Sequence, residues 1–299
     1  MAWNNKTKAE KKAAKDARAR AMRECEQGVR YDAHFVPDGG YMVHTHAPKY
    51  SARWAIMGVE IETQPLRNGQ YNAMLRSGGN YYANGIFPCY DGSLGRDGIE
   101  WKTDAGTLPW LFSTVSTLYA NMERCGYTAN YDGGYAWNCG LHIHIAKSTF
   151  GVTEYAWQNA AYKMAVVIDR FVDWFEEMAG RNFQEWAPSG NIRYIARVGE
   201  RSVNDLPVRN AQADMQAYFD CTKYAAVNVA HEDTIELRIG AGRASEYAVK
   251  QYLVRVNALV NLVKERKLST VWFEECTLDE FVAAFYEKEN EVLNMVAGL

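Results

Sequence analysis

Short segments of alternating apolar and polar residues run through the chain and predict β-strands. Successive side chains of a strand point to opposite faces, so a period of two marks a strand with one apolar face. The last two predicted strands are separated only by His231-Glu232-Asp233 and predict a hairpin. The predicted strands are residues 54–62, 86–91, 98–103, 139–145, 223–230 and 234–240.

Longer segments with helical spacing lie between and after these strands. Residues 108–124 predict a helix that ends near Gly126, a residue type suited to a helix C-cap. Thr153 is a suitable N-cap for one long helix that reaches Ala179. Further helices are predicted at residues 207–219, 245–266 and 278–296.

This order of elements predicts an α+β fold. We expect a mostly antiparallel sheet with helices packed on one face, within a single domain at residues 51–299. Residues 1–50 are predicted to form a basic helical N-terminal arm and lead-in, with nine Lys/Arg against four Asp/Glu in residues 1–30, a local charge of +5. Such an arm can contact a protein or nucleic acid, or can serve only as a solubilising extension.

Composition narrows the class of protein. With 48% hydrophobic residues the 299-residue chain can bury a large core, and its net charge of −3 argues against a general nucleic-acid binder. No run of apolar residues is long enough to span a membrane, and the N-terminus has no signal-peptide core. The six cysteines contain no Cys-x-x-Cys pair, which favours a reducing, cytoplasmic setting.

Charged and imidazole side chains occupy one face of four predicted strands. In each strand the pair lies two residues apart, with aliphatic or aromatic residues on the other face. Asp91 and Ser93 extend the pattern. The pairs are Glu60 with Glu62, Glu100 with Lys102, His142 with His144, and Glu236 with Arg238.

This polar face predicts a metal centre. Clustered carboxylates repel one another, and Mg²⁺ or Mn²⁺ with oxygen ligands and an occasional imidazole relieves that repulsion. Four carboxylates and two histidines exceed one coordination sphere, so we expect two or more ions. Arg238 could bind a phosphate or form a plain salt bridge with Glu236 or Glu60. The alternative is an ordinary sheet with a solvated polar side.

Five sequence motifs resemble those of a known family and follow one another in the same order along the chain. The segments "GVEIET", "DGSL", "GIEWKT", "GLHIHI" and "KYAAVNVAHEDTIELRIG" occur as in the amidoligase family. That family, found in bacteria and bacteriophages, is similar in fold to glutamine synthetase and glutamate–cysteine ligase. The resemblance spans roughly residues 54–250 and implies a glutamine synthetase-like sheet with a metal and nucleotide site on one face.

The resemblance also implies roles for individual residues. The implied metal ligands are Glu60, Glu62, Glu100, His142, Glu236 and Asp91. The nucleotide-binding residues that the resemblance implies are His144 and Arg238. Lys102 and Arg193 are further candidates for nucleotide binding, and Arg197 is a candidate for a phosphate contact; no motif of the family anchors either arginine. The implied catalytic residues are Arg238, Glu62 and Lys102.

The implied activity is an ATP-dependent carboxylate–amine ligation that forms an amide or peptide bond through an acyl phosphate. ATP and two or more Mg²⁺ or Mn²⁺ ions are the implied cofactors, and a small-molecule or peptide carboxylate and amine are the substrates. The base that deprotonates the amine is open, with Asp91, Asp97 and Asp104 as candidates. Two other functions remain open: a two-metal hydrolase, and a non-catalytic binding or virion-assembly protein on the same fold.

Overall fold

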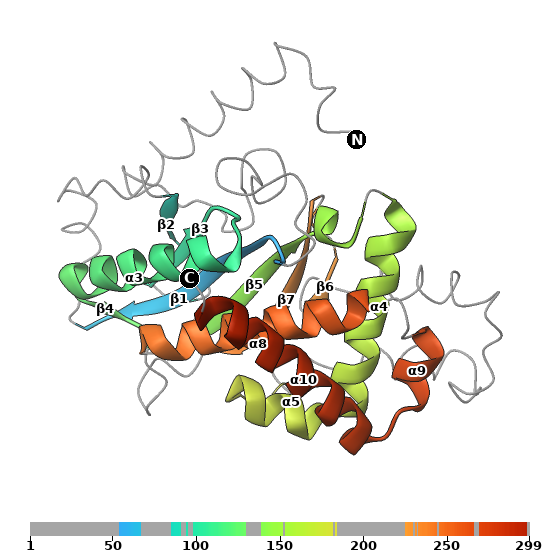
Figure 1. The fold of residues 1–299 in the computed structure, drawn as a ribbon. Coiled ribbons are helices and arrows are strands. Elements are labelled where there is room, and N and C mark those ends of the chain that lie inside the picture. Colours follow the sequence, from blue (N-terminus) through green and yellow to red (C-terminus); the bar gives the residue numbers. More distant parts are fainter. Residues whose placement is uncertain are drawn as a thin grey trace, which may run out of the picture. The chain divides into compact units, whose positions relative to one another are not determined.

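The computed structural model describes residues 54–66, 85–90, 94, 98–129, 139–151, 153–181, 183, 225–229, 231, 233–243, 245–265 and 269–297. Figure 1 shows its elements, which follow the chain in this order: β1 (Met57–Pro65), β2 (Ile86–Tyr90), β3 (Ile99–Thr103), α3 (Leu108–Cys125), β4 (Tyr127–Thr128), β5 (Gly140–Ala146), the 3₁₀ helix η5 (Lys147–Phe150), α4 (Glu154–Arg170), α5 (Val172–Ala179), β6 (Val227–Asn228), β7 (Thr234–Ala241), α8 (Glu246–Lys264), α9 (Thr270–Glu275) and α10 (Leu278–Ala297).

The fold is α+β, as the sequence predicted. Within the described ranges it combines an open, mostly antiparallel sheet with six α-helices. The predicted hairpin is confirmed, because β6 and β7 pair antiparallel with Asn228 opposite Glu236. Strand β6 covers only two residues and is shorter than predicted. The predicted helix at 207–219 and the arm at 1–50 lie outside the described residues.

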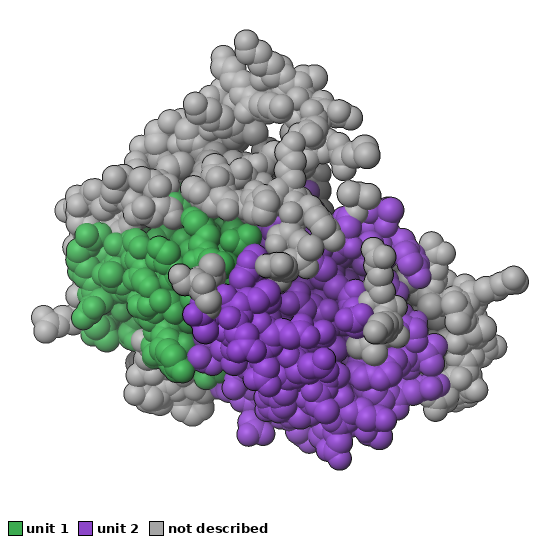
Figure 2. All heavy atoms as spheres, in the orientation of Figure 1, with its two compact units in different colours: residues 1–47, 57–144, 241–250 green, residues 48–56, 145–240, 251–299 purple. Residues whose placement is uncertain are grey.

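The chain forms two compact units, coloured separately in Figure 2. Unit 1 comprises residues 1–47, 57–144 and 241–250, and unit 2 comprises residues 48–56, 145–240 and 251–299. The expected single domain at 51–299 stays a prediction.

In unit 1, β1 is the central strand. It pairs antiparallel with β3, with Ile61 opposite Trp101, and β2 pairs antiparallel with the other edge of β3. The strand order is β2-β3-β1-β5, and the short β4 pairs with the end of β1. The inward faces of β1, β3 and β5 are fully buried, with zero exposure at Val59, Ile61, Ile99, Trp101, Leu141 and Ile143.

Helix α3 contacts β1 and β4. Its buried residues include Leu111, Val115 and Leu118, whose spacing of four and three places them on one stripe. The helix ends as predicted at Gly126, which adopts a left-handed φ of 72° and donates its N–H to the carbonyls of Met122 and Glu123. A residue with a Cβ would be strained there.

In unit 2, the predicted long helix is wrong in one respect. Thr153 caps α4 as expected, accepting a hydrogen bond from the Ala156 N–H, but the helix breaks at Phe171. Phe171 has φ −120° and ψ 41°, outside helical values. The break redirects α5, so that Trp174 packs edge-on against Phe281 and Phe285 of α10. Tertiary packing of aromatic rings has overridden local helix propensity.

The C-terminal helices of unit 2 include one that the sequence pattern missed. Helix α9 begins after Ser269, whose side chain accepts a hydrogen bond from the Trp272 N–H, and it contacts α4. Among the helices of the described ranges, none combines the length and apolarity that crossing a bilayer requires.

The four described cysteines are in the reduced state. They are Cys89, Cys125, Cys139 and Cys276. Cys25 and Cys221 lie outside the described residues.

Replacement of Ile143 by Ala should test the buried apolar face of β5. The side chain has zero exposure, so its loss should lower the free energy of unfolding by about 2–5 kcal/mol in a urea titration. Val271→Ala, at a position 40% exposed, is the control and should change it by no more than about 0.5 kcal/mol. Equal effects at the two positions would contradict the assignment of this face to the core.

Candidate metal centre

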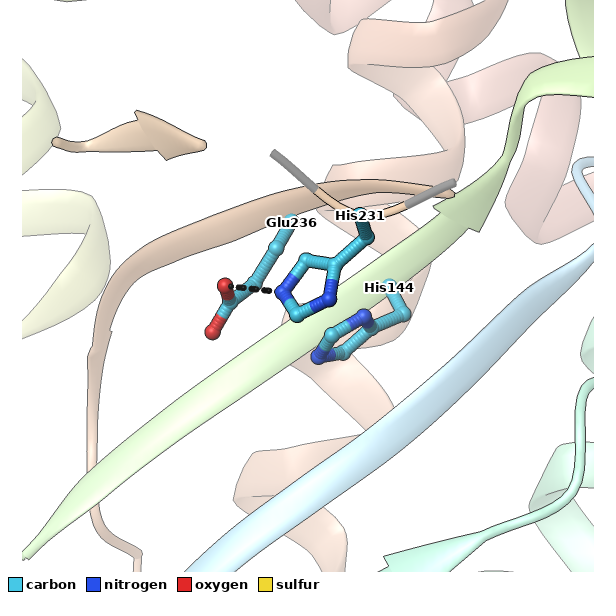
Figure 3. Close-up of side chains that lie close together, drawn as sticks. All are labelled: His144, His231 and Glu236. Atoms are coloured by element: carbon cyan, nitrogen blue, oxygen red, sulfur yellow. Dashed lines mark hydrogen bonds and ion pairs between the residues drawn. The ribbon is translucent and has the colours of Figure 1, made fainter. Parts of the chain in front are cut away.

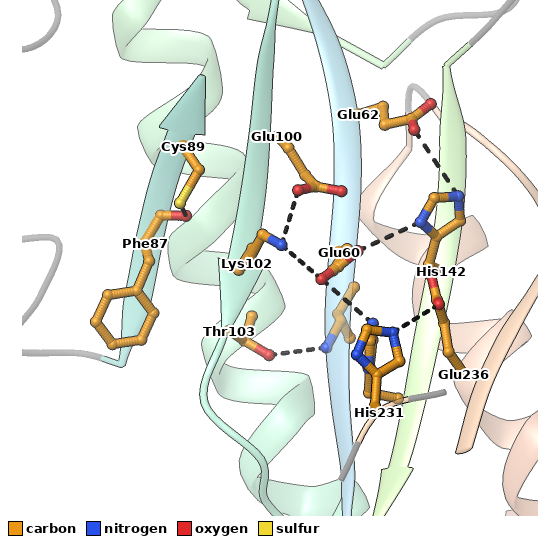
Figure 4. A network of polar contacts seen from close by, with 12 residues as sticks. Glu60, Glu62, Phe87, Cys89, Glu100, Lys102, Thr103, His142, His231 and Glu236 are labelled. Atoms are coloured by element: carbon orange, nitrogen blue, oxygen red, sulfur yellow. Dashed lines mark hydrogen bonds and ion pairs between the residues drawn. The ribbon is translucent and has the colours of Figure 1, made fainter. Parts of the chain in front are cut away.

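Strand pairing brings the predicted polar residues of unit 1 together. In the β1–β3 register Glu60 lies opposite Lys102, and Glu62 lies opposite Glu100. Residues directly opposite on antiparallel strands share a face of the sheet, and β5 adds its two histidines beside β1. We call the following six residues the unit 1 cluster: Glu60, Glu62, Glu100, Lys102, His142 and His144. Figure 4 labels all of them except His144.

The unit 1 cluster is buried. The exposed fractions of its residues run from 2% at Glu60, Glu100 and His144 to 7% at Glu62. A solvated polar sheet face would leave such side chains in water. The alternative of an ordinary amphipathic sheet is therefore wrong for this part of the structure, and the charges must be compensated within the protein.

Lys102 supplies part of that compensation. Its Nζ lies 2.8 Å from Glu60 Oε1 and 2.9 Å from Glu100 Oε2. Burial alone would lower the pKa of Lys102, but the carboxylates of Glu100 and Glu60 outweigh it and hold the pKa well above its usual range. Lys102 is therefore a fixed cation between two carboxylates.

Glu60 connects this ion pair to both histidines. Its Oε1 lies 3.2 Å from His144 Nε2, and its Oε2 lies 3.3 Å from His142 Nδ1. Burial would raise the pKa of Glu60, but Lys102 and the two imidazoles outweigh burial and hold the pKa well below its usual range. Glu60 is thus ionised, and it orients His142 through Nδ1.

Glu62 is anchored by the main chain. Its Oε2 accepts a hydrogen bond from the Gly140 N–H at the start of β5, and its Oε1 lies 3.8 Å from His142 Nε2. Burial and the Glu62 carboxylate raise the pKa of the adjacent Cys139 thiol to about 12. The backbone bond fixes the carboxylate beside the imidazole edge that points away from Glu60.

Three of these residues fit a divalent ion. Glu62, Glu100 and His142 each offer one ligand atom, and these atoms lie within 4.8 Å of one another. Opposite ligands of Mg²⁺ are about 4.2 Å apart, so small movements would close the set around one ion. Carboxylate oxygens with one imidazole suit Mg²⁺ or Mn²⁺, and the Glu60–His142 contact supplies the carboxylate partner that metal-binding histidines commonly have.

The charge count favours the same conclusion. Three carboxylates and one ammonium leave the unit 1 cluster with a net charge of −2 when both imidazoles are neutral, from −3 and +1. A buried net charge is costly, and a divalent cation would cancel it.

Unit 2 holds a second polar group around Glu236. This carboxylate is fully buried. Its Oε1 accepts a hydrogen bond of 2.6 Å from Arg238 Nη1. Its Oε2 accepts a hydrogen bond of 2.7 Å from Asn228 Nδ2 and lies 3.0 Å from His231 Nε2. Figure 3 shows the His231 ring turned toward Glu236. The salt bridge left open for Arg238 by the sequence is therefore present with Glu236.

The structure gathers Glu60, Glu62, Glu100, Lys102, His142 and His144 in unit 1, and Glu236 with Arg238 in unit 2. Asp91, Asp97, Arg193 and Arg197 lie outside the described residues. Asp104 is described and buried.

Sequence reasoning missed two members of the Glu236 group. Asn228 lies opposite Glu236 in the β6–β7 register, so an extension of the cross-strand argument to β6 could have found it. His231 belongs to the connection between these strands and has no periodic signal.

Comparison with protein-family profiles and with curated proteins found no match to this sequence.

Removal of a candidate metal ligand should strongly weaken cation binding at the unit 1 cluster. We expect wild-type protein to bind Mn²⁺ in titration calorimetry, and Glu62→Gln, Glu100→Gln and His142→Asn each to weaken binding by about 100-fold or more, because each removes one of three protein ligands. Glu123→Gln, on the exposed side of α3, is the control: it makes the same charge change as the two glutamate variants and should leave Mn²⁺ binding unchanged. Unaltered binding in the three variants would refute the site.

The Glu236–Arg238 ion pair should show strong coupling in a double-mutant cycle. Glu236→Leu removes the buried carboxylate with which Arg238 pairs, so the free energy of unfolding without metal should fall by about 3–5 kcal/mol. Adding Arg238→Met should restore a large part of that loss, because the cation is then gone as well. Chemical denaturation of the four proteins measures the coupling, and additive effects would show that the pair is energetically unimportant.

Proposed function

We propose that the protein is an ATP-dependent carboxylate–amine ligase that forms an amide or peptide bond. The observation that carries the proposal is the buried Glu62–Glu100–His142 group, whose ligand atoms lie within 4.8 Å of one another beside the Lys102 ammonium. This donor set suits the hard divalent ions that accompany nucleotide phosphates. The ordered motifs of the sequence supply the choice of ligation over other phosphate chemistry.

The overall reaction couples two displacements. A substrate carboxylate oxygen attacks the γ-phosphorus of ATP. The bond between the γ-phosphorus and the β-γ bridging oxygen breaks, and ADP leaves. The amine nitrogen then attacks the acyl carbon, the carbon–oxygen bond to phosphate breaks, and inorganic phosphate leaves. The amine gives up a proton to a base. A bound divalent ion would neutralise charge on the transferring phosphoryl group.

The residues of the chain act by binding and positioning. Glu62, Glu100 and His142 would hold the ion, and Glu60 fixes the orientation of His142 through Nδ1. In unit 2, Arg238 is the proposed phosphate-binding residue, and its contact with Glu236 orients the guanidinium. Catalysis of this kind comes mainly from positioning and charge stabilisation rather than from covalent steps on the protein.

The proposal is tested by asking whether ATP turnover requires both an amine and a carboxylate substrate. With ATP and Mn²⁺, release of ADP and phosphate should depend on the presence of an amine and a carboxylate, supplied as amino-acid and peptide panels. Glu62→Ala should reduce turnover to background, because it removes a metal ligand, while circular dichroism shows a retained fold.

Other outcomes would favour the other two functions. Substrate cleavage with metal but without nucleotide would identify a two-metal hydrolase. No heat and no thermal shift with ATP and Mn²⁺ would favour a non-catalytic binding or assembly protein. Turnover that survives Glu62→Ala would overturn the assignment of the site.

A further inference from the structure

Lys102 shares a carboxylate with the candidate metal site. Its Nζ is 2.9 Å from Glu100 Oε2, and Glu100 is also one of the three residues that can hold an ion. The ammonium is 4% exposed, so little water screens its charge. A buried cation thus contacts the ligand that a divalent ion would need.

Two opposite effects follow from this position. Without metal, Lys102 reduces the repulsion between Glu60 and Glu100, which lie on neighbouring strands of unit 1, and keeps both in place. With metal, the ammonium repels the ion and competes with it for Glu100. At a few ångströms, even with strong dielectric screening, a unit charge and a divalent ion repel by more than tenfold in a binding constant.

We propose that Lys102 is a positioning residue that stabilises the metal-free cluster and weakens the binding of a divalent ion at Glu62, Glu100 and His142. This inference rests on the proposed metal centre. It differs from a direct contact between Lys102 and nucleotide phosphate, the role for which the sequence makes Lys102 a candidate. A weakened site would exchange its ion readily and load it together with a phosphate-bearing substrate.

The experiment compares Mn²⁺ binding to full-length wild-type protein and Lys102→Gln by titration calorimetry, without nucleotide. Glutamine keeps a hydrogen-bond donor beside the two glutamates and removes the charge. The dissociation constant for Mn²⁺ should fall by about tenfold or more. Lys288→Gln removes a cation that pairs with Glu265 and Glu291 on the surface of unit 2, and its affinity for Mn²⁺ should match wild type.

Thermal unfolding gives a second readout. Lys102→Gln should melt at a lower temperature than wild type without metal, because Glu60 and Glu100 lose their shared counter-ion. Saturating Mn²⁺ should raise its melting temperature by more than that of wild type. A variant that folds only with Mn²⁺ would equally support the proposal.

The outcomes separate this inference from the proposed function. Absence of Mn²⁺ uptake by both wild-type protein and Lys102→Gln, with and without ATP, overturns both. Wild-type binding with equal or weaker binding by Lys102→Gln overturns the inference alone, and a variant that loses ATP affinity with unchanged Mn²⁺ affinity assigns Lys102 to the phosphate instead.

A second background covers the case in which Lys102→Gln does not fold with or without Mn²⁺. Glu60→Gln already lacks one of the two carboxylates that pair with Lys102, so adding Lys102→Gln leaves fewer buried charges uncompensated. The double variant should bind Mn²⁺ about tenfold or more tightly than Glu60→Gln alone. Equal or weaker binding overturns the inference.

Discussion

The burial of three carboxylates on one face of a sheet is the constraint on which the rest of unit 1 depends. Glu60, Glu62 and Glu100 would repel one another in a medium of low polarity, and each would lose hydration. They are tolerated because cationic, imidazole and backbone donors are built into the same strands. The aliphatic residues on the opposite face hold those strands in the register that makes the contacts possible.

Period-two patterning was sufficient to predict which polar residues share a face. It placed Glu60 with Glu62 and Glu100 with Lys102, and the β1–β3 register then set them opposite each other. Pattern alone could not give the Lys102 distances or the use of the Gly140 N–H, because these depend on register and on backbone groups that no side-chain pattern reports.

The features that the sequence failed to predict have similar physical causes. The break at Phe171 contains no proline or glycine, and it arises from rings of α10 that are more than 100 residues away in sequence. Helix α9 is a short segment capped by Ser269, too short to show a periodic stripe. His231 was missed because it lies in a connection, where residues are positioned by the strands they join rather than by a repeat.

The main-chain anchor on Glu62 determines how an ion would be coordinated. Because Oε2 accepts the Gly140 N–H and Oε1 lies beside His142 Nε2, this anchor favours coordination of an ion through Oε1. Glu100 is also held in place, because its Oε2 contacts the Lys102 ammonium. Mg²⁺ prefers an octahedral shell, so three protein donors would leave about half of the coordination sphere to water or to oxygen atoms of another ligand.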